Sequence, residues 1–392
     1  SQGGSVGRYN TATGEQTYIK PPAPDATTLM RFNWNAAIAQ DPFDKKTIYF
    51  GSQFLHKSTN KGASWKIISS DLTTNDSAKI DQTNNGGLSV DITGAENHCT
   101  ILTIAPSSVQ KDLIWIGTDD GNVQITRDSG KTWSNVTANI KGLPKNTWCY
   151  HIEASVFNEG TAYAVFDGHS KNDYTAYVYK TSDFGKTWTS ITTPEIGSFA
   201  RNIQEDYKNP NLLFLGTEKG LYITIDGGKN WSKFENNMPA VSVMHLDLHK
   251  KTNDLVMATH GRGIIIIDDI SVLRQITQDI VKKDVHFFET KAYPKLAISS
   301  APRFCPRSGQ VPRGPKTVRR DGLFGHRATR AGPREPRGRS GDWPTPGHGA
   351  HRRARGHDLL QHVQPASGGQ VQAQRLHQPA VPVARRRQGL GS

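Results

Sequence analysis

Four aspartates follow short apolar segments, in positions where a carboxylate could act on a bound ligand. The four are Asp119, Asp120, Asp167 and Asp173. The apolar segments before them are 113–118 and 162–166. Two carboxylates held apart across a cleft are what a two-carboxylate glycoside hydrolase needs, one of them as general acid. These four residues are therefore the catalytic candidates, although Asp119-Asp-Gly121 also has the composition of an ordinary hairpin turn.

A second set of polar residues has the chemistry to hold a ligand. It comprises Arg31, Asn35, Glu96, His98, His169, Arg201, Glu218, His260 and Arg262. A planar guanidinium binds a carboxylate through two parallel hydrogen bonds, so the arginines suit an acidic group. In His260-Gly-Arg-Gly263, two glycines flank an arginine and permit a close backbone approach. Glu218-Lys-Gly220, by contrast, also suits a plain turn. The polar loop 167–173 has carboxylates and an imidazole that could bind a sugar or a cation.

The elements that carry these residues repeat along the chain. The pattern Ser/Thr-x-Asp-x-Gly-x-x-Trp occurs four times, with Asn in place of Asp in the first copy. The copies span 58–65, 126–133, 181–188 and 224–231. The residues predicted to be structural in them are Asn60, Trp65, Asp128, Trp133, Asp183, Trp188, Asp226 and Trp231. The Asp can accept backbone N–H bonds across its own turn, the Gly supplies a positive φ, and the Trp packs between neighbouring hairpins.

Short apolar strands surround each copy in a constant order, here called A, B, C and D. Strands A are expected at Trp34–Ala39, Cys99–Ala105, Cys149–Val156, Phe199–Gln204 and Val241–Leu248. Each pattern forms the turn between strands C and D. The Trp residues of successive copies are 68, 55 and 43 residues apart. Repeated groups of four short strands, with no amphipathic helix between them, are typical of β-propeller blades.

The predicted fold is therefore all-β, a β-propeller of four-stranded blades. About five blades are expected over residues 1–270. Residues 5–19 have the pattern of the last hairpin of an earlier blade, so we expect the chain to be a fragment of a larger propeller. A helix is expected near 271–283, within a linker over 271–298.

The repeated pattern resembles the Asp-box, or BNR repeat, of sialidases, sortilin-type propellers and xyloglucan-degrading propeller enzymes. Segments 31–35, 117–121 and 258–269 are similar to bacterial sortilin-like or BNR-repeat glycosyl-hydrolase proteins. The resemblance covers about residues 5–290. It implies an exported protein, periplasmic or secreted.

The strand order predicts which turns share a face. In an antiparallel blade the A–B and C–D turns lie at one end, and the B–C turns and the loops between blades lie at the other. The repeated Asp turns therefore lie away from the catalytic and ligand-binding candidates. By analogy with other propellers, a ligand is expected on the B–C side.

Two classes of function remain open on that side. A sialidase-type hydrolase needs three arginines for the substrate carboxylate and a Tyr nucleophile assisted by a Glu. The arginines Arg31, Arg201 and Arg262 map to the candidate face, but the Phe-Arg-Ile-Pro signature of sialidases is absent and the spacing places no Tyr/Glu pair. A binding module needs no acid–base pair, and aromatic residues such as Tyr174 could stack on sugar rings. We therefore predict binding of a glycan or a peptide, with glycoside hydrolysis as the alternative.

The positive charge is confined to the end of the chain. The full sequence has 48 Lys+Arg and 35 Asp+Glu, a formal charge of +13. Residues 301–392 hold 18 Lys+Arg and 4 Asp+Glu, which leaves 30 and 31 in residues 1–300. This tail has 17 Arg against 1 Lys and contains no Asn, Ile, Tyr or Met.

Three interpretations compete for this tail: a disordered basic arm, a nucleic-acid-binding segment, or translation in a shifted reading frame. Arg, Gly, Pro and Ala have GC-rich codons, whereas Asn, Ile, Tyr, Met and Lys have AT-rich codons. A switch in both sets near residue 300 favours the frameshift. We therefore predict that residues 299–392 are disordered and that nucleic acid is not a partner.

Other classes of protein are excluded by composition. The longest apolar run, 263–267, is far too short to cross a bilayer. Three cysteines are too few for a disulfide-rich scaffold or a four-thiolate zinc site. A disulfide between Cys99 and Cys149 would require their strands to lie close together. No phosphate loop or dinucleotide fingerprint occurs in residues 1–300, so we expect no cofactor and no metal.

Overall fold

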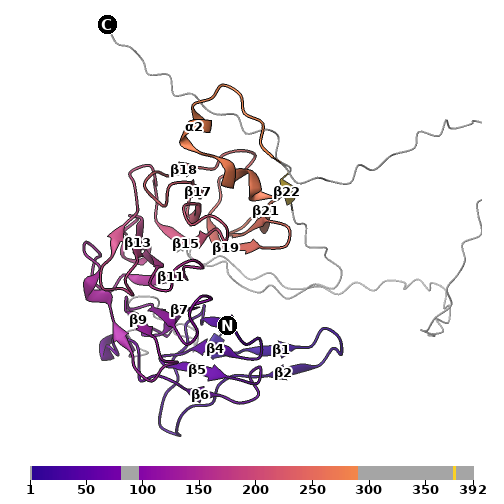
Figure 1. Ribbon diagram of the computed structural model, residues 1–392. Coiled ribbons are helices and arrows are strands. Elements are labelled where there is room, and N and C mark those ends of the chain that lie inside the picture. Colours follow the sequence, from indigo (N-terminus) through magenta and orange to yellow (C-terminus); the bar gives the residue numbers. More distant parts are fainter. Residues whose placement is uncertain (1, 81–96, 290–373, 377–392) are drawn as a thin grey trace, which may run out of the picture. The chain divides into compact units, whose positions relative to one another are not determined.

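Five four-stranded sheets and one two-stranded sheet form the fold in the computed structural model (Figure 1). The structure describes residues 2–80, 97–289 and 374–376. In each of the first four sheets, consecutive strands pair in antiparallel fashion in chain order. The prediction of an all-β propeller fragment built from four-stranded blades is confirmed.

The sheets are numbered here in chain order. Sheet 1 contains β3 (Ile38–Gln40), β4 (Ile48–Gly51), β5 (Leu55–Ser58) and β6 (Lys66–Ile67). Sheet 2 contains β7 (Ile101–Pro106), β8 (Ile114–Thr118), β9 (Val123–Thr126) and β10 (Ser134–Asn135). Sheet 3 contains β11 (Trp148–Ala154), β12 (Ala162–Asp167), β13 (Tyr177–Thr181) and β14 (Thr189–Ser190). Sheet 4 contains β15 (Ala200–Glu205), β16 (Leu213–Thr217), β17 (Gly220–Thr224) and β18 (Ser232–Lys233). Sheet 5 contains β19 (Val243–His249), β20 (Asp254–Thr259), β21 (Ile264–Ile267) and β22 (Gln374–Leu376).

The helical segments are all short. The α-helices are α1 (Ser77–Ile80) and α2 (Gln278–Val281). The 3-10 helices are η1 (Gln2–Gly4), η2 (Thr137–Asn139), η3 (His169–Lys171) and η4 (Ile270–Gln275). No helix in the described ranges is both long enough and apolar enough to cross a membrane.

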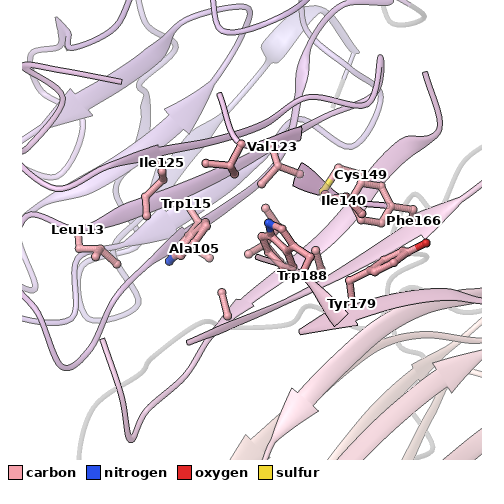
Figure 2. Close-up of a cluster of buried hydrophobic side chains, with 14 residues drawn as sticks. Ala105, Leu113, Trp115, Val123, Ile125, Ile140, Cys149, Phe166, Tyr179 and Trp188 are labelled. Carbon is pink, nitrogen blue, oxygen red and sulfur yellow. The ribbon is translucent and has the colours of Figure 1, made fainter. Parts of the chain in front are cut away.

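Neighbouring sheets pack face to face, and a separate apolar core fills each of the four interfaces. Successive side chains of a strand point to opposite faces, so one strand serves two cores. On β8, Trp115 faces sheet 3, whereas Ile114 and Ile116 face sheet 1. Figure 2 shows the core between sheets 2 and 3, where Trp115 meets Trp188 edge to face at 5.9 Å. This double burial explains why the B strands are apolar without interruption.

The first strand is shorter than predicted. The expected strand Trp34–Ala39 begins only at Ile38, because Asn33 holds the preceding residues in a turn. Its side-chain oxygen accepts the N–H of Asn35 at 3.0 Å, and its carbonyl accepts the N–H of Ala36 at 3.1 Å. This Asx turn competes with extended backbone.

The helix predicted near 271–283 is broken into two pieces, η4 and α2. Thr277 separates them in an extended conformation, with φ −123° and ψ 164°, and its side chain caps α2 by accepting the N–H of Ile280. A Thr in this position favours a new helix start over continuation of the old helix.

Sheet 5 ends differently from the others. After β21 the chain enters η4 rather than an antiparallel fourth strand, and the fourth position is taken by β22, which pairs in parallel with β21. Ile270 and Leu273 of η4 are buried in the core between sheets 4 and 5. Arg274 then makes two hydrogen bonds to the buried Asp206, at 2.7 and 2.9 Å. The rest of the predicted tail 299–392 lies outside the described residues, as does the connection 81–96.

The four repeated turns make the same hydrogen bonds. In the copy at 126–133, the Thr126 hydroxyl accepts the N–H of Gly130 at 2.9 Å, and Asp128 accepts the N–H of Thr132 at 2.9 Å. The other copies have the same two bonds at the corresponding positions. Hydrogen bonds, first of all from the Thr132 hydroxyl, lower the pKa of Asp128 to about 2. The turn is thus closed by its own side chains.

The Trp of each turn reaches the sheet before it. Trp133 donates from Nε1 to the carbonyl of Ile68, and Trp231 donates to the carbonyl of Ile191. Trp65 donates in the same way to Ile19, which directly follows the two-stranded sheet of β1 (Gly7–Tyr9) and β2 (Gln16–Tyr18). The chain after the β1–β2 hairpin therefore accepts a bond from the Trp of sheet 1, in the same way as the outer part of a sheet accepts a bond from the Trp of the next sheet.

Candidate functional site

The B–C turns lie at the opposite end of the sheets from the repeated Asp turns, and this end is called the B–C face. The turns comprise residues 52–54, 119–122, 168–176, 218–219 and 260–263. Backbone hydrogen bonds tie them to the loops between sheets. The N–H of Glu218 donates to Phe199 at 3.2 Å, and the N–H of His260 donates to Ser242 at 3.0 Å.

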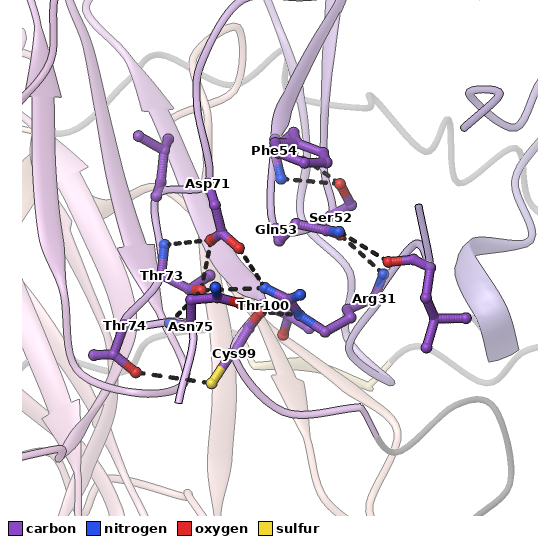
Figure 3. A network of polar contacts seen from close by, with 12 residues as sticks. Arg31, Ser52, Gln53, Phe54, Asp71, Thr73, Thr74, Asn75, Cys99 and Thr100 are labelled. Carbon is purple, nitrogen blue, oxygen red and sulfur yellow. Dashed lines mark hydrogen bonds and ion pairs between the residues drawn. The ribbon is translucent and has the colours of Figure 1, made fainter. Parts of the chain in front are cut away.

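Arg31 is buried in a polar network at the start of this face (Figure 3). Its Nη2 donates to Asp71 at 2.6 Å, and its Nε donates to the carbonyl of Cys99 at 3.1 Å. Its backbone N–H donates to the side chain of Gln53 at 2.9 Å. The arginine joins three segments that are far apart in sequence, and the network leaves it little freedom to hold a ligand.

Asp119 and Asp120 are fully enclosed. Asp119 accepts the N–H of Thr100 at 2.8 Å, its hydroxyl at 2.5 Å, and the amide of Asn33 at 2.9 Å. Asp120 accepts the N–H and the hydroxyl of Thr74, both at 2.7 Å. Their relative exposures are 0% and 1%, so neither carboxylate is presented to solvent. Burial, followed by the nearby Asp120, raises the pKa of Asp119 to about 7.

His98 is buried beside this pair, with its Nδ1 3.7 Å from Asp119 and its ring 6.1 Å from that of Trp148. Burial lowers the pKa of His98 to about 4, so the ring is neutral at physiological pH. These contacts make His98 part of the interior.

The predicted residues Asp167, His169 and Arg201 come together. The Asp167 carboxylate accepts three hydrogen bonds. One comes from Nη1 of Arg201 at 2.6 Å, one from the backbone N–H of His169 at 2.9 Å, and one from Nδ1 of the His169 ring at 2.8 Å. Arg201 occupies a bulge in β15, where the register with β16 shifts between residues 200 and 202. A bulge re-aims a side chain, and this one turns Arg201 toward Asp167.

Aromatic rings surround this ion pair. The Arg201 guanidinium lies 4.9 Å from the ring of Tyr150 and 4.8 Å from that of Phe199. His169 stacks on Phe199 at 5.1 Å with an interplanar angle of 12°, and Tyr174 lies 6.0 Å from the same ring. Tyr174 is 59% exposed, so its ring is accessible to a ligand.

A groove of about 630 Å³ lies between the B–C turns of sheets 4 and 5. Glu218 and Lys219 form one wall, and His260 and Arg262 form the other. Ser242 is buried between them and donates its hydroxyl to Glu218 at 2.8 Å. The backbone bond from Glu218 to Phe199 described above makes the segment that carries Phe199 a neighbour of this wall.

Two further predicted residues lie elsewhere, and one is not described. Asn35 is exposed in the turn before β3. Asp173 accepts the N–H of Thr175 at 3.1 Å and the hydroxyl of Tyr177 at 2.8 Å, which orders its own loop. Glu96 lies outside the described residues.

The three arginines predicted for a sialidase-type triad have different roles. Arg31 pairs with Asp71, and Arg201 pairs with Asp167. Arg262 is exposed and makes no hydrogen bond or ion pair within the described ranges. The first two guanidiniums are thus already committed to protein carboxylates, so the site does not have three free arginines for one substrate carboxylate.

Some residues of the site were not predicted from sequence: Tyr150, Phe199, Lys219, Lys233 and Ser242. Lys219 stands next to a predicted residue and could have been included on that ground. Tyr150 lies in a bulge of β11, and a bulge leaves no mark in the sequence. Phe199 directly precedes β15 and is buried, as its apolar side chain suggests.

The structure gives no metal or disulfide chemistry in the part of the chain that it describes. No group of three His, Cys, Asp or Glu side chains there could hold a metal ion. Cys99 and Cys149 are buried free thiols, and burial raises the pKa of Cys99 to about 12. Cys305 lies outside the described residues.

Comparison with protein families identifies a match for part of the chain. Residues 176–291 match the Sortilin-Vps10 family, described as sortilin, neurotensin receptor 3. The matched segment runs from the end of the long B–C loop of sheet 3 to beyond η4. This propeller segment is therefore sortilin-like. No curated protein matches the chain.

Several solved structures are similar to parts of the chain. The GH74 xyloglucanase from Xanthomonas campestris has 19% identity and a TM-score of 0.43, over 58% of this chain and 35% of the enzyme. The GH74 enzyme of Niastella koreensis has 16% identity and a TM-score of 0.32, over 66% of this chain and 48% of the enzyme. YCF48 from Cyanidioschyzon merolae has 13% identity and a TM-score of 0.38, over 62% of this chain and 67% of that protein. The chain thus spans about a third to a half of the length of the two enzymes.

Proposed function

We propose that this chain is an extracytoplasmic ligand-binding propeller whose ligand, a glycan or a peptide, binds on the B–C face. The observation that carries the proposal is the groove of about 630 Å³ between the B–C turns of sheets 4 and 5. A concave site with a few convergent polar groups is the usual form of a binding site. Both walls of the groove belong to the sortilin-like segment 176–291.

The aromatic cluster beside the groove supports the same proposal. Tyr174 is exposed, and the part-exposed ring of His169 stacks on the buried Phe199, which also lies 6.0 Å from the Tyr174 ring. Exposed aromatic rings supply a large contact area at a small cost in conformational entropy. Placed beside a polar groove, they suit a ligand with alternating flat and polar surfaces.

The carboxylates favour binding over hydrolysis. A general acid must reach the leaving group directly or through one water. Asp119, Asp120 and Asp167 are at most 1% exposed and accept hydrogen bonds from neighbouring groups. Their geometry suits the support of loops better than proton transfer to a ligand.

The resemblance to exported proteins supports the extracytoplasmic location. The segments similar to bacterial sortilin-like proteins include 258–269, of which residues 260–262 line the groove. Export of this chain is accordingly part of the proposal.

The test is to fill the groove. Ala240 is exposed and lines the groove, so Ala240→Trp should block it without disturbing a core. The matched control is Ala63→Trp, at another exposed alanine, in the first Asp turn. The full chain is screened on glycan and peptide arrays, and the affinities of hits are measured by calorimetry. We expect A240W to weaken binding by about tenfold or more and A63W to leave it unchanged.

Equal affinities of A240W and the parent chain would overturn the proposal. The same hits are also incubated and their products analysed. Turnover that is lost in Asp167→Asn would instead support the hydrolase alternative.

A further inference from the structure

The charges around the groove are unequal. Lys219, Lys233 and Arg262 line it, against the single carboxylate of Glu218. That carboxylate already accepts the Ser242 hydroxyl at 2.8 Å, so part of its capacity is used. The remaining charge favours an anionic ligand.

Each cation retains donors for such a ligand. Lys219 uses one bond to the carbonyl of Gly197 at 3.1 Å, and an ammonium has three donors. Lys233 lies 3.7 Å from Glu235, and both side chains are exposed, so that pair is weak. Arg262 is exposed and, in the ranges that the structure describes, makes no bond of its own. Its guanidinium is free to bind a carboxylate or sulfate through two hydrogen bonds.

Part of the backbone around the groove is paired. Thr259 donates its N–H to Gly263 at 3.0 Å, and its hydroxyl donates to the same carbonyl at 2.7 Å. The N–H groups of Glu218 and His260 are used as described above. These bonds hold the turns on both sides of the groove, so that the charged side chains of the lining project from ordered backbone.

The rings next to the groove suit a sugar. The backbone N–H of Glu218 donates to the carbonyl of Phe199, so the segment that carries Phe199 adjoins the turn of Glu218. The Phe199 ring is buried, whereas the rings of His169, stacked on it, and of Tyr174 reach the surface. A pyranose has an apolar face that packs on an aromatic ring and a rim of hydroxyls that polar side chains can bind. An anionic oligosaccharide combines both features with the charge that the groove complements.

We infer that the groove binds an acidic oligosaccharide. Its carboxylate or sulfate groups pair with Arg262 and the two lysines, and a neighbouring sugar ring lies on the accessible rings of His169 and Tyr174. The inference rests on the proposed function and specifies the class of its ligand.

The experiment compares ligands of one length in the full chain. The probes are a galacturonate tetrasaccharide, a sulfated tetrasaccharide, a neutral glucose tetrasaccharide and a tetraglutamate peptide. Affinities are measured by calorimetry for the parent chain and for Arg262→Ala. The control is Arg127→Ala, an exposed arginine of an Asp turn at the other end of sheet 2. Residues 301–392 carry a net +14 in every protein compared, so binding to this tail cancels in the comparison of the two variants.

We expect one or both acidic saccharides to bind about tenfold or more tightly than the neutral saccharide. R262A should lose about tenfold in affinity for that ligand, and R127A should match the parent chain. The carboxylated and sulfated probes show which anionic group is preferred.

Three results would overturn the inference. Equal binding of neutral and acidic saccharides, or equal affinities of R262A and R127A, would show that the groove does not select charge, although the binding face would stand. Binding of tetraglutamate alone would replace the glycan by an acidic peptide on the same face. If A240W also binds every array ligand as the parent does, the proposed function fails as well.

Discussion

The two ends of the sheets differ in how alike their turns are. At one end, four turns repeat the same side-chain bonds, so that Thr126 and Asp128 do what Thr224 and Asp226 do two sheets later. At the B–C end, the turns range from two to nine residues. The turns at 119–122 and 260–263 share a length and a closing bond from a Thr N–H, but their side chains differ: Asp119 is buried, whereas Arg262 is exposed. The end with the repeated Asp turns is the one that holds the sheets together. At the B–C end, the turns vary, so they can change without loss of the fold.

The B–C face itself divides into a closed part and an open part. Around sheet 2, Asp119 and Asp120 find donors in the adjoining loops and are sealed by them. Around sheets 4 and 5, Lys219 and Arg262 are exposed at a groove. The B–C turn therefore carries a buried, structural carboxylate, Asp119, in sheet 2 and an exposed cation, Arg262, in sheet 5. Burial and local donors decide which role a polar residue takes.

The largest effect should come from the closed part, through pH. The pKa of Asp119 is raised to about 7 in the folded protein, whereas an unfolded chain has the ordinary value near 4. A raised pKa means that the folded state holds the proton more tightly, so this contribution to stability is complete below about pH 4 and is lost as pH rises to about 7. Relative to Asp119→Asn, which does not titrate, the parent chain should lose up to about 4 kcal/mol of unfolding free energy over that range.

Urea unfolding of both proteins at several pH values measures this difference. Asp167→Asn is a suitable comparison, because it replaces a second buried carboxylate of this face, one that is paired with Arg201. A stability difference between parent and D119N that does not change from pH 4 to pH 7 would show that Asp119 is ionised throughout. The Thr100 and Asn33 donors would then outweigh the burial of the charge.

A somewhat smaller effect should separate two arginines of the same face. Arg201→Ala leaves the buried Asp167 carboxylate without its cation, and loss of one partner of a buried pair costs about 3 kcal/mol or more. Arg262→Ala removes an exposed side chain and should change stability by less than about 0.5 kcal/mol. Thermal and urea unfolding of the two variants give the comparison. Equal stabilities would mean that the closed and open parts do not differ in the way described.

The repeating end could be predicted from the sequence because its interactions are local. Each Asp turn closes on residues two to four positions away, so a single pattern contains all the partners. The strand order follows from the same repeats. The short strand β3 and the broken helix after β21 were missed, because single residues, Asn33 and Thr277, redirect the chain there.

The B–C face could be predicted as a location but not in its details. Asp119 is sealed by Asn33, which is 86 residues away in the sequence, and Asp167 is paired with Arg201, 34 residues away. No local sequence pattern predicts hydrogen-bond partners that are so far apart in the sequence. The sequence therefore placed candidates such as Asp120 and Arg262 on one face without distinguishing the buried side chain from the exposed one. Tyr150 was missed because it lies in a bulge, which depends on the pairing between two strands. Phe199 was missed because its stacking partner, His169, lies 30 residues away in the sequence.

The smallest effect tests whether the repeating end is as uniform as its sequence. Trp231 and Trp188 hold the same position in their turns and are similarly buried, at 4% and 8% exposure. Nε1 of Trp231 donates to Ile191 at 2.7 Å, whereas Nε1 of Trp188 is buried without a partner in the described structure and its ring packs on Trp115 instead. Substitution by Phe removes similar ring area in both cases, so the difference between the variants isolates the hydrogen bond.

Trp231→Phe should therefore be less stable than Trp188→Phe by about 1 kcal/mol, because the first leaves a buried carbonyl unpaired and the second removes an unpaired donor. Urea unfolding of both variants beside the parent chain measures this. If W188F loses as much stability as W231F, the indole N–H contributes nothing beyond ring packing. Since the hydrogen bonds inside the four turns are alike, a difference would have to come from the contact each Trp makes with the sheet before it.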